Sequence, residues 1–262
     1  MSTFSLIAKR QLRTPTRNMT TSVAHKIKVD MVSDAICPFC YIGYKNYNQG
    51  VALAKQKNLD LDLDLEFKPF LLDPTLTSEP MVKRDRYAQK FGGKERVAAM
   101  EQQMVQRGKD VGINFSYGGT LSRTHDYHRV MAHAYEKGGE PLQRKVAESF
   151  FTGYFENEQD PGQRPYLVKT ALDTGVFASE KEANDFFDSS AFDKEVNAGY
   201  RQAKELGVSG VPFFVLDNKY GISGAQPPEA FLQVFEQLSK EKKPQPEQLA
   251  DGGACEVGKE CS

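Results

Sequence analysis

Two close pairs of cysteines are the residues of this 262-residue chain whose type and spacing suggest chemistry. Cys37 and Cys40 are separated by two residues, and Cys255 and Cys261 lie near the C-terminus. Four cysteines are too few for a disulfide scaffold, and a chain of this length can bury a core that needs none. We therefore expect the cysteines to serve chemistry rather than stability.

The first pair has the spacing of a dithiol that exchanges disulfides. The attacking species is a thiolate, which the N-terminus of a helix stabilises through unpaired N–H groups and the positive end of its dipole. Apolar residues recur at helical spacing from Cys37 to about Asn58, which places both cysteines at a helix start. We expect Cys37 to attack a substrate disulfide and Cys40 to resolve the mixed disulfide. Pro38 suits the first helical position, and Phe39 offers a substrate an apolar face.

A structural zinc site is the competing interpretation of the same motif. Zinc would need two further ligands, from Cys255 and Cys261 or from His125, His128 and His133. His128 and His133 lie five residues apart on a predicted helix, where ligands on one face are three or four apart. The sequence therefore favours redox chemistry without a metal.

The segments around the cysteines predict a small sheet flanked by helices. Residues 26–32 read as a strand that ends just before Cys37, and residues 61–68 alternate apolar with charged side chains, as a half-buried strand does. Residues 213–216 and 220–223 form a predicted hairpin around Asp217-Asn218, and a last helix begins at Pro228.

A block of helical periodicity separates these elements. It spans about residues 81–206 and contains no comparable strand pattern. We predict an α/β, thioredoxin-like fold with a large all-helical insertion. The predicted parts are an N-terminal extension (1–25), the thioredoxin-like domain (26–80 and 207–240), the helical insertion (81–206) and a flexible cysteine-containing tail (241–262).

Three motifs in the same order resemble one family. They are SDAICPFCYIG at residues 33–43, GVSGVPFFV at 207–215 and SGAQPPE at 223–229. This set closely resembles the DsbA-like FrnE family, thioredoxin-fold proteins related to 2-hydroxychromene-2-carboxylate isomerases and kappa-class glutathione transferases. The resemblance covers roughly Ile27 to Leu238.

The resemblance implies roles for individual residues. Cys37 corresponds to the attacking cysteine, Cys40 to the resolving one, and Pro212 to a cis-proline that faces the disulfide. Val211 would then bind a substrate chain through its main-chain groups, as an added strand does. Phe39 stands where many relatives have Trp. The segment 124–129 resembles a helix start that lines the cleft in relatives, and we assign it no catalytic role.

The predicted function is exchange with protein or small-molecule disulfides. One alternative is a glutathione-dependent transferase or isomerase, whose members characteristically carry Ser at the position of Cys37. The other is a redox-regulated binding protein. We expect no cofactor, except that glutathione could act as reductant or co-substrate. The expected partners are disulfide-containing proteins or small thiols; no oligomeric state is predicted.

The second cysteine pair has two interpretations. Cys255 and Cys261 could exchange with Cys37 and Cys40 as a relay, because their segment contains glycine and could close a small disulfide ring. They could equally be two exposed thiols, since no local charge activates either sulfur.

The charge and hydropathy of the chain exclude some classes of binding partner. The net charge is −1, from 34 basic and 35 acidic residues mixed along the chain, so we expect no nucleic acid partner. No apolar run reaches the ~18 residues of a membrane span. The first 29 residues contain Lys, Arg, Ser and Thr but no Asp or Glu, as in a mitochondrial transit peptide. We expect a mitochondrial matrix or cytoplasmic location. The alternative is that residues 1–25 form an N-terminal extension that carries no targeting signal.

Overall fold

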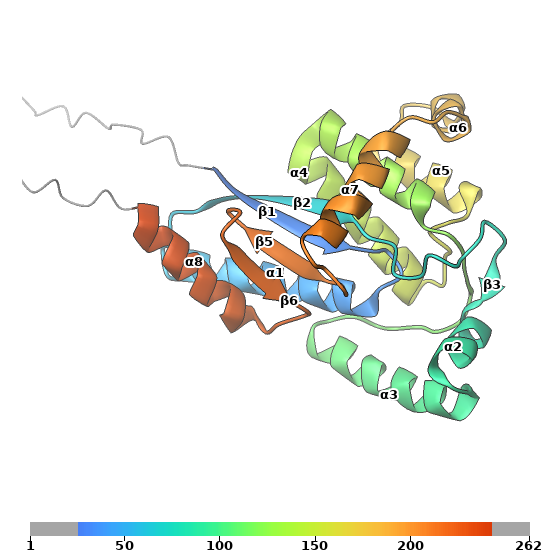
Figure 1. Cartoon of the computed structure of the whole chain (residues 1–262), viewed down its shortest axis with the longest axis horizontal. Helices are drawn as coiled ribbons and strands as arrows, with labels where there is room; N and C mark the ends of the chain where they lie inside the picture. Colours follow the sequence, from blue (N-terminus) through green and yellow to red (C-terminus); the bar gives the residue numbers. More distant parts are fainter. Residues whose placement is uncertain (1–25, 243–262) are drawn as a thin grey trace, which may run out of the picture.

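A four-stranded mixed sheet forms the centre of the molecule, which a computed structural model describes over residues 26–242 (Figure 1). The strands lie in the order β2-β1-β5-β6. β1 (Lys26–Ser33) pairs in parallel with β2 (Asp62–Pro69) and antiparallel with β5 (Phe213–Leu216), which pairs antiparallel with β6 (Tyr220–Ser223). The predicted strands and the hairpin are therefore present.

The central strand β1 follows from alternation along its sequence. Ile27, Val29 and Met31 are completely buried, while Lys26 and Lys28 between them are exposed. Because side chains alternate between the faces of a strand, the three apolar residues share one face and build the core. The strand then leads directly into the turn that carries Cys37.

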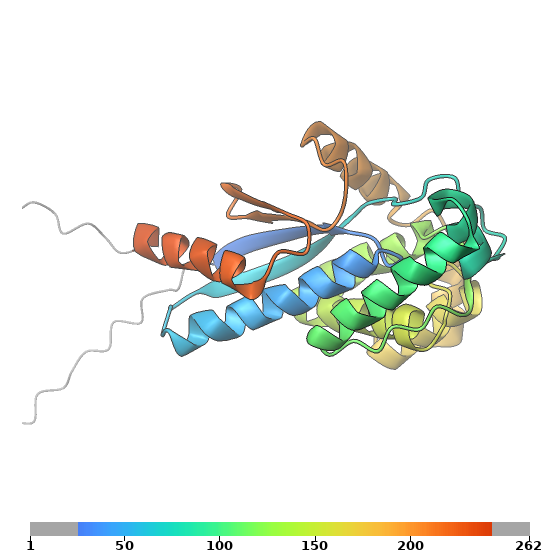
Figure 2. The ribbon, with the colours of Figure 1, turned by 90° about the horizontal axis from the view of Figure 1, so that it is seen from below.

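Two helices cover one face of the sheet (Figure 2). They are α1 (Pro38–Gln56) and α8 (Pro228–Lys242). Tyr47 of α1 stacks on Phe214 of β5 and meets Phe231 of α8 edge to face. Gly50 permits this approach, since a Cβ there would lie 2.7 Å from the Phe231 Cβ. These contacts fix the axis of α1, and with it the position of its N-terminus.

The inserted segment is mostly helical but also contains a short two-stranded sheet. Its helices are α2 (Lys83–Phe91), α3 (Lys94–Asp110), α4 (His125–Glu156), α5 (Arg164–Thr174), α6 (Glu180–Asp188) and α7 (Asp193–Glu205). β3 (Met81–Val82) pairs antiparallel with β4 (Thr120–Leu121), so the prediction of an all-helical insertion is wrong at this point. Strands of two residues are too short to produce a recognisable alternation.

The long helix α4 joins the insertion to the sheet. It is kinked at Gly139, whose φ of 63° and ψ of −158° are not helical, so two helical segments meet there and Pro141 lies at the start of the second. α4 and α7 both pack against β2. Tyr41 of α1 stacks on Phe151 of α4 with ring centroids 5.1 Å apart. Within residues 26–242, no helix is both long enough and apolar enough to cross a bilayer.

Candidate active site at the N-terminus of α1

Cys37 occupies the position that precedes the first turn of α1. Its backbone is extended, with φ −92° and ψ 110°, and its N–H donates to the Asp34 carbonyl at 3.2 Å. Pro38 follows at the start of the helix, where its missing N–H leaves no intrahelical bond unmade. The Cys37 thiol donates to the Val211 carbonyl at 3.3 Å. A main-chain group of a distant loop therefore faces the first sulfur.

Cys40 lies one turn further along α1 and is completely buried. Its N–H donates to the Cys37 carbonyl at 3.0 Å, and no disulfide joins the two cysteines in this structure. Burial, together with the neighbouring Cys37 sulfur, raises the pKa of the Cys40 thiol well above its ordinary value. The Cys40 thiol therefore keeps its proton at neutral pH.

The loop before β5 forms the opposite side of the site. The Val211-Pro212 peptide bond is cis. Gly43 of α1 lets the loop approach, because a Cβ there would lie 2.8 Å from the Pro212 Cγ. Among the described residues, the amides of Ser209, Gly210 and Val211 find no main-chain acceptor. This stretch is therefore free to pair with an extended chain.

A hollow of about 410 Å³ opens beside Cys37, between the start of α1 and the helices α2 and α3. Its walls are mostly apolar and include Ile36, Leu72, Phe91, Val97, Met104 and Leu121. Phe39 stands at its rim with 40 % of its surface exposed, and it also borders a second hollow along residues 207–213. Phe39 and Val211 thus separate two recesses, and Cys37 borders the apolar one.

Charged groups around the apolar hollow are largely paired with one another. Arg86 donates three hydrogen bonds to Asp73, one from Nε at 3.0 Å and two from Nη2 at 2.7 and 2.8 Å. Burial of Asp73 opposes ionisation, but hydrogen bonds from Thr75 and Arg86 and the charge of Lys90 lower its pKa to about 2. Glu101 is held by Arg84 at 3.1 Å. Both carboxylates of the hollow are therefore paired with an arginine.

Asp34, in the turn between β1 and α1, is buried behind the cysteines. Its Oδ2 accepts the Leu72 N–H at 2.8 Å, whereas Oδ1 has no hydrogen-bond partner and lies 3.7 Å from His128 Nε2. Burial raises the pKa of Asp34 to about 6. Asp34 was not among the predicted site residues; its position three residues before Cys37 was the available signal.

The histidines considered as zinc ligands have other contacts. His128 is buried and its Nε2 donates to the Phe70 carbonyl at 2.9 Å, and burial lowers its pKa to about 3. His133 stacks on Phe177 and Phe186. Within residues 26–242, no group of three potential ligands gathers that includes Cys37 and Cys40. Cys255 and Cys261 lie outside the described residues.

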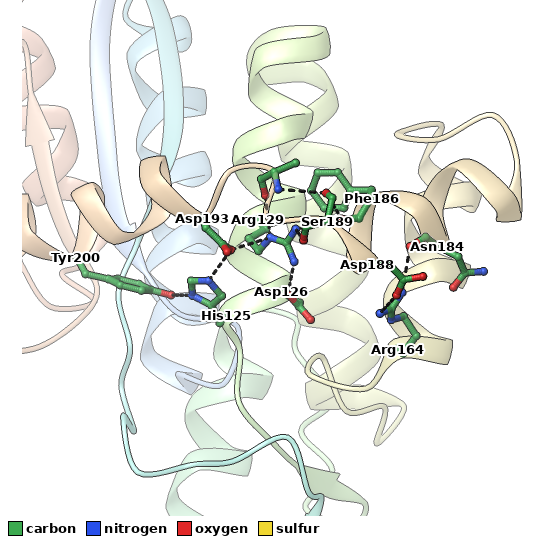
Figure 3. Close-up of polar contacts among 11 residues, drawn as sticks. His125, Asp126, Arg129, Arg164, Asn184, Phe186, Asp188, Ser189, Asp193 and Tyr200 are labelled. Atoms are coloured by element: carbon green, nitrogen blue, oxygen red, sulfur yellow. Dashed lines mark hydrogen bonds and ion pairs between the residues drawn. The ribbon is translucent and has the colours of Figure 1, made fainter.

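A second cluster of polar residues lies in the insertion, around Arg129 (Figure 3). All three guanidinium nitrogens of this buried side chain donate, to Asp126 and to the carbonyls of Phe186, Ser189 and Ala191. His125 bridges Asp193 (3.1 Å) and the Tyr200 hydroxyl (3.2 Å). The cluster joins the start of α4 to α6 and α7.

Comparison with known proteins identifies the family. The family model of the DSBA-like thioredoxin domain matches residues 28–236. The chain belongs to this family. The predicted resemblance to DsbA-like proteins and the predicted fold are therefore confirmed. The DSBA-like domain occupies almost all of the described structure. A search of curated proteins finds no match.

Solved structures resemble the DSBA-like chain over most of its length. A probable DsbA oxidoreductase from Streptomyces coelicolor is 28 % identical, with a TM-score of 0.73, over 88 % of this chain and 97 % of that one. The cytosolic disulfide reductase DsbM from Pseudomonas aeruginosa, solved with GSH, is 14 % identical (TM-score 0.54; 81 % and 99 % covered). A 2-hydroxychromene-2-carboxylate isomerase is 17 % identical (TM-score 0.53; 82 % and 97 %). The last two share the fold, which thus serves oxidoreductases and an isomerase.

Proposed function

We propose that the protein is a thiol-disulfide oxidoreductase that works through Cys37 and Cys40. One observation carries the proposal: a thiol at the N-terminus of α1 faces the Val211 carbonyl, with a second, buried thiol one helical turn behind it. Both thiols are buried, but Cys37 borders a hollow that a substrate can enter, whereas Cys40 does not line it. That division of access suits a two-step exchange.

The proposed reaction is balanced by the two thiols alone. The Cys37 thiolate attacks one sulfur of a substrate disulfide, forming a mixed disulfide and releasing the other sulfur as a thiolate. Cys40 then loses its proton and attacks the Cys37 sulfur, which releases the second substrate thiolate and leaves a Cys37–Cys40 disulfide. Two electrons pass from the pair to the substrate. The reverse sequence oxidises a dithiol, and the potential of the pair relative to its surroundings sets the direction.

The loop at Val211 supplies a way to hold a protein substrate. Its free main-chain groups lie beside Cys37, so an extended segment can pair with residues 209–211 while its disulfide lies over the sulfur. We propose disulfide-containing proteins as the principal substrates, with small thiols such as glutathione as reductant. No metal or other cofactor enters the proposed reaction.

The glutathione-dependent transferase or isomerase remains the second candidate. The apolar hollow beside Cys37 favours it, since such a space could hold a small aromatic substrate. The two candidates differ in their need for Cys40: disulfide exchange requires a resolving thiol, whereas attack or isomerisation by a single activated group does not.

The deciding experiment measures insulin reduction, reactivation of scrambled ribonuclease and glutathione conjugation with the same protein. We expect the first two activities in the wild type and their loss in Cys37→Ser. Cys40→Ser should lose turnover of insulin as well. Conjugation or isomerisation that survives Cys40→Ser, with no insulin reduction by the wild type, would establish the second candidate instead.

Cys255 and Cys261 lie outside the described residues, and we propose them as a relay that exchanges with the Cys37–Cys40 pair. The double variant Cys255→Ser/Cys261→Ser should then slow multiple turnover on protein substrates but leave a single turnover by the reduced enzyme unchanged. Equal multiple-turnover rates would remove the relay.

The N-terminal extension, also outside the described residues, is proposed to direct the protein to the mitochondrial matrix. A C-terminally tagged protein should move from mitochondria to cytoplasm when residues 1–18 are deleted. Cytoplasmic fluorescence of both forms would contradict the proposed mitochondrial targeting signal.

A further inference from the structure

Arg107 differs from the other cations that line the apolar hollow. Arg86 and Lys90 are both drawn to Asp73, at 2.7 and 3.4 Å, and Glu101 is taken by Arg84. Within the part of the chain that the structure describes, no carboxylate forms an ion pair with Arg107. Among the described residues, Arg107 is thus the cation of the lining that has no carboxylate partner.

Arg107 lies over an aromatic ring next to the proposed attacking sulfur. Its guanidinium carbon lies 5.9 Å from the centroid of the Phe39 ring, and Phe39 is two residues from Cys37. Cation–π contact at this distance holds the guanidinium over the ring but leaves its N–H donors free for an anion. Phe39 and Arg107 are both exposed, so a bound substrate can touch them.

The hollow and the cation make different demands on a substrate. The walls of the hollow are apolar and would gain most from an aliphatic or aromatic side chain. The guanidinium at the rim would gain from a carboxylate, with which it can form two parallel hydrogen bonds. Glutathione supplies carboxylates but no apolar group for the hollow, so a polypeptide matches the pair of features better.

We propose that the enzyme selects polypeptide disulfides whose cysteine is flanked by an apolar residue, which enters the hollow, and an acidic residue, which binds Arg107. This inference rests on the proposed disulfide exchange and names its substrate class. Arg107 acts as a specificity-determining residue: it touches the flanking carboxylate and takes no part in sulfur chemistry.

The test uses symmetric disulfide dimers of short peptides. In each peptide, Leu or Ser flanks the cysteine on one side and Glu or Gln flanks it on the other. Each combination is made in both orders along the peptide. Reduced enzyme lacking Cys255 and Cys261 (both changed to Ser) reacts in a single turnover, so no external reductant is needed. The readout is the second-order rate constant for each peptide, with glutathione disulfide as a further substrate.

The wild-type site should prefer Glu over Gln roughly fivefold, the scale of a partly exposed ion pair, and added salt should reduce this ratio. The rate constant for peptides with Leu should exceed that for peptides with Ser by roughly tenfold. Arg107→Gln should bring the Glu-to-Gln ratio to about one without slowing the Gln peptide, and Arg107→Glu should invert the ratio. Lys109→Gln is the matched control, because Lys109 is an exposed cation of the same helix that does not line the hollow; it should change neither ratio.

Several results would overturn the proposal. A Glu-to-Gln ratio that survives Arg107→Gln, or that falls equally in Lys109→Gln, would show that Arg107 does not read the carboxylate. Equal rates for Leu and Ser peptides, with glutathione disulfide reacting as fast as any peptide, would point to a small-thiol site. If no peptide reacts and Cys37 stays unmodified, disulfide exchange itself fails, which is a separate outcome from lost selectivity.

Discussion

Two polar regions of this molecule are built in opposite ways. Around Arg129, every guanidinium nitrogen has an acceptor, and the donors and acceptors come from three helices and their connecting loops. At the start of α1, Cys37 meets one main-chain carbonyl. Within residues 26–242, the amides of residues 209–211 have no main-chain acceptor and no carboxylate forms an ion pair with Arg107. The first region is complete without a ligand; the second region presents groups that a substrate would complete.

A dense polar cluster in this fold need not be a functional site. His125, with Asp193 and Tyr200, has the composition of a catalytic group, yet each member is bonded within the cluster (Figure 3). The cysteine site has fewer polar atoms, but they border an open hollow. Unpaired groups beside a hollow indicate a binding site better than a dense polar network does.

The largest expected effect is a loss of activity when the cysteine site is changed. Cys37→Ser should reduce disulfide exchange by more than about a thousandfold, the scale on which losing a covalent nucleophile acts in enzymes. Thermal unfolding should change little, because serine is nearly isosteric with cysteine. Rates per folded molecule, measured by insulin reduction, check the prediction. Substantial residual exchange by Cys37→Ser would place the nucleophile elsewhere.

The second expected effect is a loss of stability when the Arg129 cluster is changed. Arg129→Met should lower the free energy of unfolding by about 3 kcal/mol, because it leaves buried carbonyls and two carboxylates without their partner. Arg164→Met is the matched control: its ion pair with Asp188 is largely exposed, so the loss should stay below about 1 kcal/mol. Denaturant titration measures both. Full activity per folded Arg129→Met molecule is expected; a selective loss of activity would give the cluster a catalytic role.

A third effect concerns His128, whose Nε2 lies 3.7 Å from Asp34 and whose ring meets Tyr200 edge to face. Its pKa is about 3 in the folded protein, against 6.5 when unfolded, so between these values the unfolded state binds more protons and stability rises with pH. Asp34, raised to about 6, has the opposite slope from pH 3.8 to 6.

The difference between His128→Gln and the wild type isolates the histidine. Relative to the wild type, the variant should gain about 3 kcal/mol as the pH falls from 6.5 to 4. Denaturant midpoints at a series of pH values give this difference curve. Parallel curves would mean that His128 is not held neutral by burial.

Local patterns were sufficient for part of this structure. The alternation in β1, the paired runs around Asp217-Asn218 and the helical spacing after Cys37 act within one element, so the sequence predicts those elements within a few residues. Tertiary contacts were not predictable in this way. Asp34 meets His128 across 94 residues of chain, and Arg107 reaches Phe39 from a helix with no chemical motif of its own.

The same distinction applies to the candidate site. Cys37, Cys40, Phe39, Val211 and Pro212 carry recognisable motifs, and the structure gathers them at one end of the sheet. The wall of the hollow comes from α2 and α3, whose residues read only as ordinary amphipathic helices. Motifs therefore predict the proposed reacting sulfurs, whereas the hollow beside them is assembled only by the fold.

One measurement tests the central claim most directly. A Cys40→Ser variant that also carries Cys255→Ser and Cys261→Ser retains a single cysteine, so an attack that cannot be resolved should accumulate as a mixed disulfide. After incubation with a peptide disulfide, mass spectrometry of the digested protein should find one equivalent of peptide on Cys37. The same variant with Cys40 restored should release the peptide and form the Cys37–Cys40 disulfide. An unmodified Cys37, or an adduct on Cys40 when both thiols are present, would contradict the assignment of attacking and resolving sulfurs.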